Sequence, residues 1–169
     1  MKKFILLILF ILLTVLSVMI IDEQREVFRL KKVIPSFSST LPAVRISSDD
    51  AVFEFHPYDN EAAKKFLAQL PLKMIMTRWG DGGYSGSLPK KIDAAPLQEN
   101  TRRAFFKGEV VLHQTGRTVF LMFGATPVVF FADYPMLLSS GGIPLGQLKD
   151  YSGLEHLTGV SEFVFEVKK

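Results

Sequence analysis

Short runs of alternating apolar and polar residues recur along residues 45–169, and turns rich in glycine or proline separate them. A two-residue period is typical of strands that bury one face, and many short strands favour an all-β domain. The clearest hairpin joins residues 109–113 to residues 118–123 through a turn that contains Gly116. The other predicted strands and apolar runs comprise residues 52–55, 72–79, 84–88, 128–132, 141–148 and 162–167.

One amphipathic helix is predicted over residues 61–69, where apolar residues line one side. Asp59 or Asn60 can cap its N-terminus, and Pro71 ends it. A single helical turn is predicted over residues 151–157. Seven or eight short strands with one good helix indicate a closed barrel or a sandwich.

An apolar segment runs from Phe4 to Ile21 without a charged residue. As a helix its eighteen residues would extend ~27 Å, close to the ~30 Å hydrocarbon core of a bilayer. We therefore predict that this segment is the chain's contact with a membrane. The predicted organisation is a transmembrane anchor or signal segment over residues 1–21, a stalk or linker over residues 22–44 and a folded domain over residues 45–169.

The fate and orientation of the apolar segment leave alternatives open. Lys2 and Lys3 precede it as in an export signal, but no Ala-x-Ala cleavage site follows, which favours an uncleaved anchor. The short basic N-terminus predicts an extracytoplasmic domain, in the periplasm or at the cell surface, and cleavage would make it secreted. Four basic residues after the span argue for the opposite orientation.

The charges of the predicted domain balance. From Arg45 onward the chain has 14 Lys and Arg against 14 Asp and Glu. Nucleic-acid binding normally requires a net positive face, so a nucleic-acid partner is not expected. The chain has no cysteine, which excludes disulfides and thiolate chemistry.

No catalytic or metal-binding motif is evident. The three histidines, His56, His113 and His156, lack the spacing of metal ligands, so neither a metal nor another cofactor is predicted. No G-x-S-x-G nucleophile elbow exists. Asp81 and Glu109 are carboxylates with no evident acid–base partner in the sequence, and neither is predicted to be catalytic.

Three amphipathic side chains flank the glycine-rich turn over residues 80–83. Arg78, Trp79 and Tyr84 could line the rim of a barrel and stack against a ligand or peptide. The alternative interpretation is a surface arginine beside partly buried aromatic residues.

Several of these segments, in this order, resemble the bacterial cyclophilin-like domain family over roughly residues 45–157. The resemblance rests on Leu70-Pro71-Leu72, on the hairpin from Gly80 to Pro89, on Lys107-Gly108-Glu109-Val110-Val111-Leu112, on residues 120–127 and on Ile143-Pro144-Leu145-Gly146-Gln147-Leu148. It implies a mostly β fold, a closed β-barrel with one or two helices at its ends. Bacterial members of the family generally lack an assigned activity.

The resemblance also implies where a ligand would bind. By themselves, Met122 and Phe131 are typical of simple core residues. Under the resemblance they would be among the residues that floor an apolar groove suited to a proline-like ring. The strings that surround the proline pocket of eukaryotic cyclophilins, such as Phe-His-Arg and Gln-Gly-Gly-Asp, do not occur here, so no catalytic arginine can be transferred to this chain.

The resulting hypothesis is a binding module for a peptide or small ligand. The alternatives are a divergent peptidyl-prolyl isomerase acting on exported proteins and a structural envelope component without a pocket.

Overall fold

The computed structural model describes residues 40–94, 97, 101–123 and 136–168, which all belong to a compact unit over residues 36–169. Nine strands and two helices form this part of the chain. In chain order they are β1 (Val44–Ser47), β2 (Val52–Pro57), α2 (Glu61–Leu67), β3 (Leu72–Trp79), β4 (Gly83–Ser87), β5 (Arg102–Phe105), β6 (Glu109–His113), β7 (Thr118–Met122), β8 (Met136–Leu148), α3 (Ser152–His156) and β9 (Val160–Val167).

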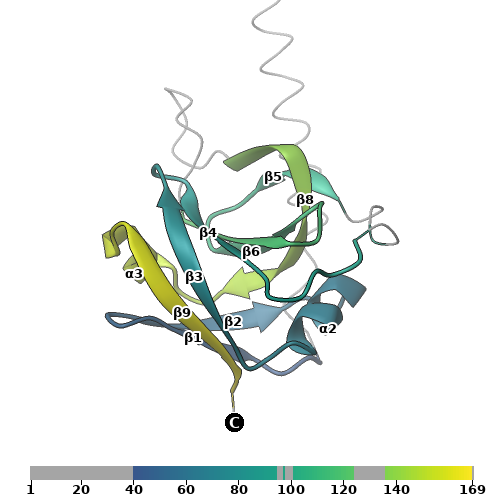
Figure 1. Cartoon of the computed structure of the whole chain (residues 1–169), viewed down its shortest axis with the longest axis horizontal. Helices are drawn as coiled ribbons and strands as arrows, with labels where there is room; N and C mark the ends of the chain where they lie inside the picture. The colour runs from purple at the N-terminus through teal and green to yellow at the C-terminus, as the bar shows by residue number, and fades with distance from the viewer. Residues whose placement is uncertain (1–39, 95–96, 98–100, 124–135, 169) are drawn as a thin grey trace, which may run out of the picture. The chain divides into compact units, whose positions relative to one another are not determined.

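Eight of the described strands close into a ring. They follow the order β2-β1-β9-β3-β4-β7-β6-β8, and β8 pairs in turn with β2, so the sheet becomes a barrel (Figure 1). Every pairing is antiparallel. Closure leaves no free sheet edge within the ring. β5 is the ninth strand and stands outside this ring, paired only with the first part of β8.

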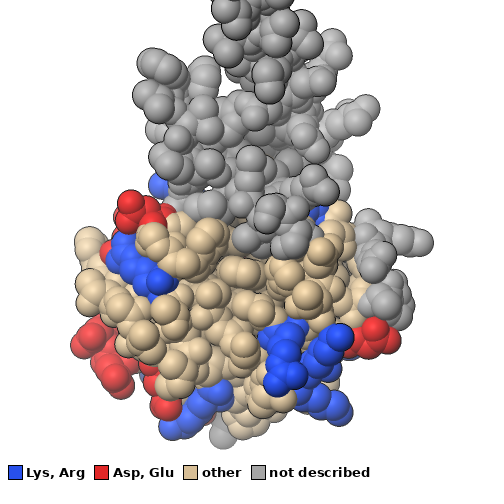
Figure 2. All heavy atoms as spheres, turned by 45° about the horizontal axis from the view of Figure 1, so that its top comes forward, with Lys and Arg blue, Asp and Glu red and all other residues tan. Residues whose placement is uncertain are grey.

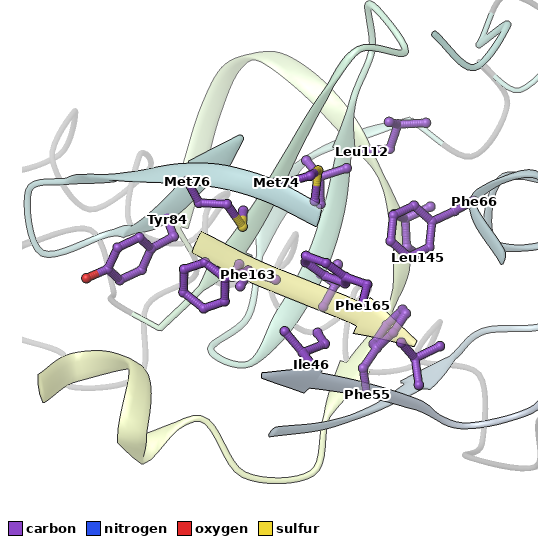
Figure 3. Close-up of a cluster of buried hydrophobic side chains, with 14 of the residues drawn as sticks. Ile46, Phe55, Phe66, Met74, Met76, Tyr84, Leu112, Leu145, Phe163 and Phe165 are labelled. Atoms are coloured by element: carbon purple, nitrogen blue, oxygen red, sulfur yellow. The ribbon is translucent and has the colours of Figure 1, made fainter. Parts of the chain in front are cut away.

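The barrel interior is filled by apolar side chains that alternate along the strands. β3 buries Leu72, Met74 and Met76 and exposes the residues between them. The interior cluster also includes large aromatic and aliphatic residues from β1, β2, β8 and β9 (Figure 3). Since each such side chain contributes roughly 1.5–3 kcal/mol when buried, this core is the main source of stability.

Helix α2 closes the interior beside β8. Asn60 accepts a hydrogen bond from the backbone N–H of Ala63 and so caps the helix, as the sequence predicted. Phe66 meets Phe55 and Phe165 edge to face, with ring centroids 6.2 and 5.8 Å apart. The helix is therefore fixed by the core as well as by its cap.

The predicted closed β-barrel with two helices is confirmed. The hairpin over residues 109–123 is β6 and β7, and the predicted helical turn is α3. Two strands were missed, β1 and β5, and β8 begins five residues before the predicted segment. The apolar run over residues 128–132 lies outside the described residues.

The described residues contain no helix that is long and apolar enough to span a membrane. The predicted segment from Phe4 to Ile21 and most of the predicted stalk lie outside them.

Candidate functional site

The structure separates the predicted ligand-binding residues onto two faces of the sheet. Arg78 follows Met74 and Met76 in the alternation of β3 and therefore points into the barrel. Its partner on β4, Tyr84, points inward as well. Trp79 and Met122 point outward and belong to a second apolar cluster. The fifth predicted residue, Phe131, lies outside the described residues.

Arg78 forms hydrogen bonds with three backbone carbonyls. Its guanidinium donates hydrogen bonds to the carbonyls of Glu155 and Leu157 at the end of α3, at 3.0 and 2.7 Å, and to the carbonyl of Gly80 at 3.0 Å. It also lies 5.1 Å from the ring centroid of Phe123. These contacts join α3 to the β3–β4 turn, which is a structural role.

Tyr84 is buried between two phenylalanine rings. Its ring centroid lies 5.4 Å from that of Phe163 and 6.0 Å from that of Phe123. Burial raises the pKa of its phenol, and the Arg78 guanidinium opposes this rise. Tyr84 is fully buried, and Figure 3 shows it at one end of the interior cluster.

The outward-facing cluster, here called the outer cluster, consists of Phe105, Val111, Met122, Trp79 and Phe120. Phe105, Val111 and Met122 are completely buried, and the ring centroids of Trp79 and Phe120 lie 5.8 Å apart in an edge-to-face contact. An apolar cluster on the outside of a closed barrel does not serve its interior packing. Trp79 and Phe120 are only half-buried, so they make the edge of the outer cluster a candidate surface for a ligand.

A buried polar network lies next to the outer cluster, around Glu109 at the start of β6. Glu109 is 1% exposed and forms an ion pair with Arg102 of β5. Its second carboxylate oxygen accepts the backbone N–H of Phe106 at 2.8 Å. The Tyr58 hydroxyl lies 3.3 Å from Glu109 Oε1 and 3.5 Å from Gln147 Oε1, so the network joins the residue that follows β2 to β6 and β8.

The electrostatics of this network follow from its burial. Desolvation raises the pKa of Glu109, while the Arg102 charge and the hydrogen bonds from Phe106, Arg102 and Tyr58 counteract the rise. Desolvation and the negative charge of Glu109 also raise the pKa of Tyr58. Tyr58 therefore remains a hydroxyl donor at neutral pH.

Arg102 connects the polar network to the outer cluster. Its guanidinium carbon lies 5.2 Å from the ring centroid of Phe105 and 5.9 Å from that of Phe106. Three buried atoms of this region have no hydrogen-bond partner in the described part of the chain: Arg102 Nε, Thr101 Oγ1 and Trp79 Nε1. Gln69 and Tyr84 hold two further such atoms elsewhere.

Comparison with known proteins supports one assignment. The model of the Cyclophilin-like family matches residues 46–165, well over half of the chain. The chain belongs to the Cyclophilin-like family. The solution structure of a hypothetical protein from Archaeoglobus fulgidus is similar to this cyclophilin-like domain, with a TM-score of 0.60 and 22% identity over 75% of this chain and 95% of that one. That likeness concerns the fold alone. No curated protein matches the chain.

Sequence reasoning missed the polar half of this site. The sequence showed no partner for Glu109, and the structure provides an ion-pair partner, Arg102, on β5, a strand that was not predicted. One signal was present, since Glu109 lies in the Lys107-Gly108-Glu109 segment on which the family resemblance rested.

The cyclophilin-like domain also has a groove of about 570 Å³ on another part of its surface. Its walls are the first half of β2 and the segment leading into α3, including Phe53, Glu54, Lys149 and Gly153. None of the predicted ligand-binding residues lines it.

On the face shown in Figure 2, several basic groups lie beside acidic ones, with a wide uncharged surface between these groups. Within residues 40–94, 97, 101–123 and 136–168, no three histidine or acidic side chains are close enough to hold a metal ion. His56 instead contacts Glu54, and His113 contacts the Thr115 hydroxyl.

Proposed function

We propose that the cyclophilin-like domain is a binding module that takes a peptide or small ligand on the outer cluster beside Arg102. Trp79 and Met122, predicted from the sequence, belong to this surface. Arg78 and Tyr84 remain predicted ligand-binding residues, but the geometry favours them less, because the donors of Arg78 are occupied and Tyr84 points into the barrel interior.

The observation that carries this proposal is the set of unpaired donors next to an apolar surface. Arg102 Nε and Trp79 Nε1 can only donate hydrogen bonds, and Thr101 Oγ1 can donate one. A buried donor without a partner typically costs about 1–3 kcal/mol, so a ligand that supplies an acceptor would relieve this cost. The complementary ligand carries an acceptor oxygen next to an apolar group.

A peptide that contains proline has this chemistry. Its carbonyl oxygen is an acceptor, and its ring is apolar and stiff, so little conformational entropy is lost on binding. Aromatic surfaces such as those of Trp79 and Phe120 are suited to contact with such a ring.

Trp79 allows a direct test because it is the only tryptophan of the chain. The full chain in detergent micelles would be titrated with capped tetrapeptides that contain proline, and the emission of Trp79 would be followed. We expect a saturable shift that Arg102→Met weakens at least ~10-fold, equivalent to about 1.4 kcal/mol. Arg45→Met is the matched control, because Arg45 is an exposed arginine on β1.

Unchanged emission with every peptide, or equal weakening by the two arginine substitutions, would contradict binding at this site.

Peptidyl-prolyl isomerisation is the second candidate function, and the unpaired Arg102 Nε favours it. A donor directed at the nitrogen of a proline peptide bond would reduce its double-bond character and lower the barrier to rotation. A protease-coupled assay on a proline peptide tests this directly. A rate equal to uncatalysed isomerisation, which takes tens to hundreds of seconds, would exclude it.

We propose further that the segment from Phe4 to Ile21 attaches this module to a membrane, with the domain outside the cytoplasm. Support comes from the length and uniform apolarity of the segment and from Lys2 and Lys3 before it. Full-length protein should sediment with membranes, resist extraction by carbonate and be degraded by protease added outside intact cells. Recovery in the soluble fraction at the mass of a processed chain would instead indicate secretion.

A further inference from the structure

Arg102 and Glu109 form a charge pair of fixed geometry at one end of the proposed site. The Arg102 side chain is 17% exposed and that of Glu109 is 1% exposed. Both oxygens of Glu109 are occupied, one by Arg102 and the other by the Phe106 N–H at 2.8 Å. The carboxylate is therefore held in place and cannot turn towards a ligand.

This pair carries no net charge. The single positive charge of Arg102 is balanced by Glu109, and the surrounding partners, Tyr58 and Gln147, carry no charge. The other unpaired donors belong to Thr101 and Trp79, which are uncharged as well. The unpaired donors of Arg102, Thr101 and Trp79 thus belong to two uncharged side chains and to an arginine whose charge Glu109 balances.

We infer that the site selects ligands with an uncharged carbonyl, as in an amide, over ligands that present a carboxylate or phosphate, and that Glu109 sets this preference. The inference rests on the proposed function, because it names the ligand class of the same site.

The physical reason is the low dielectric around the pair. A ligand carboxylate that reached Arg102 would lose its hydration and would also be repelled by the fixed charge of Glu109. An amide carbonyl loses much less hydration and is not repelled by a unit charge. A repulsive element of this kind is a common means of excluding a competing ligand.

Two probes that differ only at the acceptor test the inference: cyclopentanecarboxamide and cyclopentanecarboxylate. Neither absorbs where tryptophan is excited, so the emission of Trp79 in the full chain can report both. We expect the wild-type chain to bind the amide at least ~10-fold more tightly, which is about 1.4 kcal/mol. Equal affinities, or tighter binding of the carboxylate, would overturn the inference while leaving the proposed function intact.

Glu109→Gln then tests the residue itself. It removes the negative charge and keeps an acceptor oxygen, so the ratio of amide to carboxylate affinity should fall at least ~10-fold, mainly through tighter carboxylate binding. Glu109→Asp keeps the charge and should keep the preference. A ratio in the Gln variant equal to that of the wild type would refute the role of Glu109.

The wild-type comparison does not depend on whether the Gln variant folds. Should neither cyclopentane probe nor any capped proline peptide change the emission of Trp79, the proposed function itself fails, and the inference fails with it.

Discussion

The barrel interior and the outer cluster bury apolar side chains equally well but differ in their polar surroundings. The exposed fraction is 0% for Phe163 and Phe165 in the interior and also for Phe105 and Met122 in the outer cluster. The interior is a nearly continuous apolar core, whereas the outer cluster adjoins a buried ion pair and three unpaired donor atoms. The interior therefore accounts for the fold, and the outer cluster is the surface that we propose binds a ligand.

The largest expected effect is a cavity in the interior. Phe165 contacts Phe66 edge to face and is completely buried, so Phe165→Ala should lower the free energy of unfolding by roughly 3–5 kcal/mol. Urea denaturation monitored by circular dichroism would measure it. A loss below about 1 kcal/mol would contradict the assignment of this cluster as the main core.

A smaller loss of stability is expected from substitution of Arg78. This substitution tests whether inward-pointing residues affect ligand binding at the outer cluster. Arg78→Met removes hydrogen bonds to the carbonyls of Glu155, Leu157 and Gly80, so the chain should lose about 1–3 kcal/mol of stability. Its affinity for capped proline peptides should stay within about 2-fold of the wild type, since Arg78 points inward. A loss of affinity as large as that of Arg102→Met would show that Arg78 contributes to ligand binding and would contradict its purely structural role.

The pH dependence of stability gives a third and smaller effect. The folded-state pKa of Glu109 is raised above its ordinary value of 4.5 by burial, so the folded chain binds this proton more tightly than the unfolded chain. The stability contributed by this titration is present below the ordinary pKa and is lost as the pH rises through the raised value.

The stability of the wild type relative to Glu109→Gln should therefore be highest below the ordinary pKa of 4.5 and should decline as the pH rises through the raised pKa of the folded state. Urea midpoints of both chains across this range measure the difference. A difference that increased with pH would mean that the pKa of Glu109 is lowered in the folded state.

Local sequence pattern was sufficient to predict most of the barrel, and it pointed to only some of the residues of the proposed site. The helix after Asn60 and the hairpin of β6 and β7 follow from a cap, a glycine turn and alternating residues, all of which are local signals. Trp79 was predicted as an amphipathic side chain beside the glycine-rich turn, and Met122 was predicted through the family resemblance.

The other half depends on contacts between distant segments. β5 contains two arginines and little apolar surface, and it is a strand because it pairs with β8. Because the sequence does not reveal this pairing, it does not predict the ion pair of Arg102 with Glu109. It does not predict the contact of Tyr58 either, which lies 51 residues from Glu109. The inward direction of Arg78 likewise follows from the register of β3, which side-chain chemistry alone does not reveal.

The most direct test of the central claim, that ligands bind the outer cluster and leave the barrel interior unchanged, uses the methionines on the two faces. Met122 belongs to the outer cluster, while Met74 and Met76 lie in the interior. The full chain, labelled with ¹³C at the methionine methyl groups, would be titrated with a capped proline tetrapeptide. The account predicts a saturable shift of the Met122 methyl resonance with Met74 and Met76 unmoved. Shifts confined to Met74 and Met76 would contradict it.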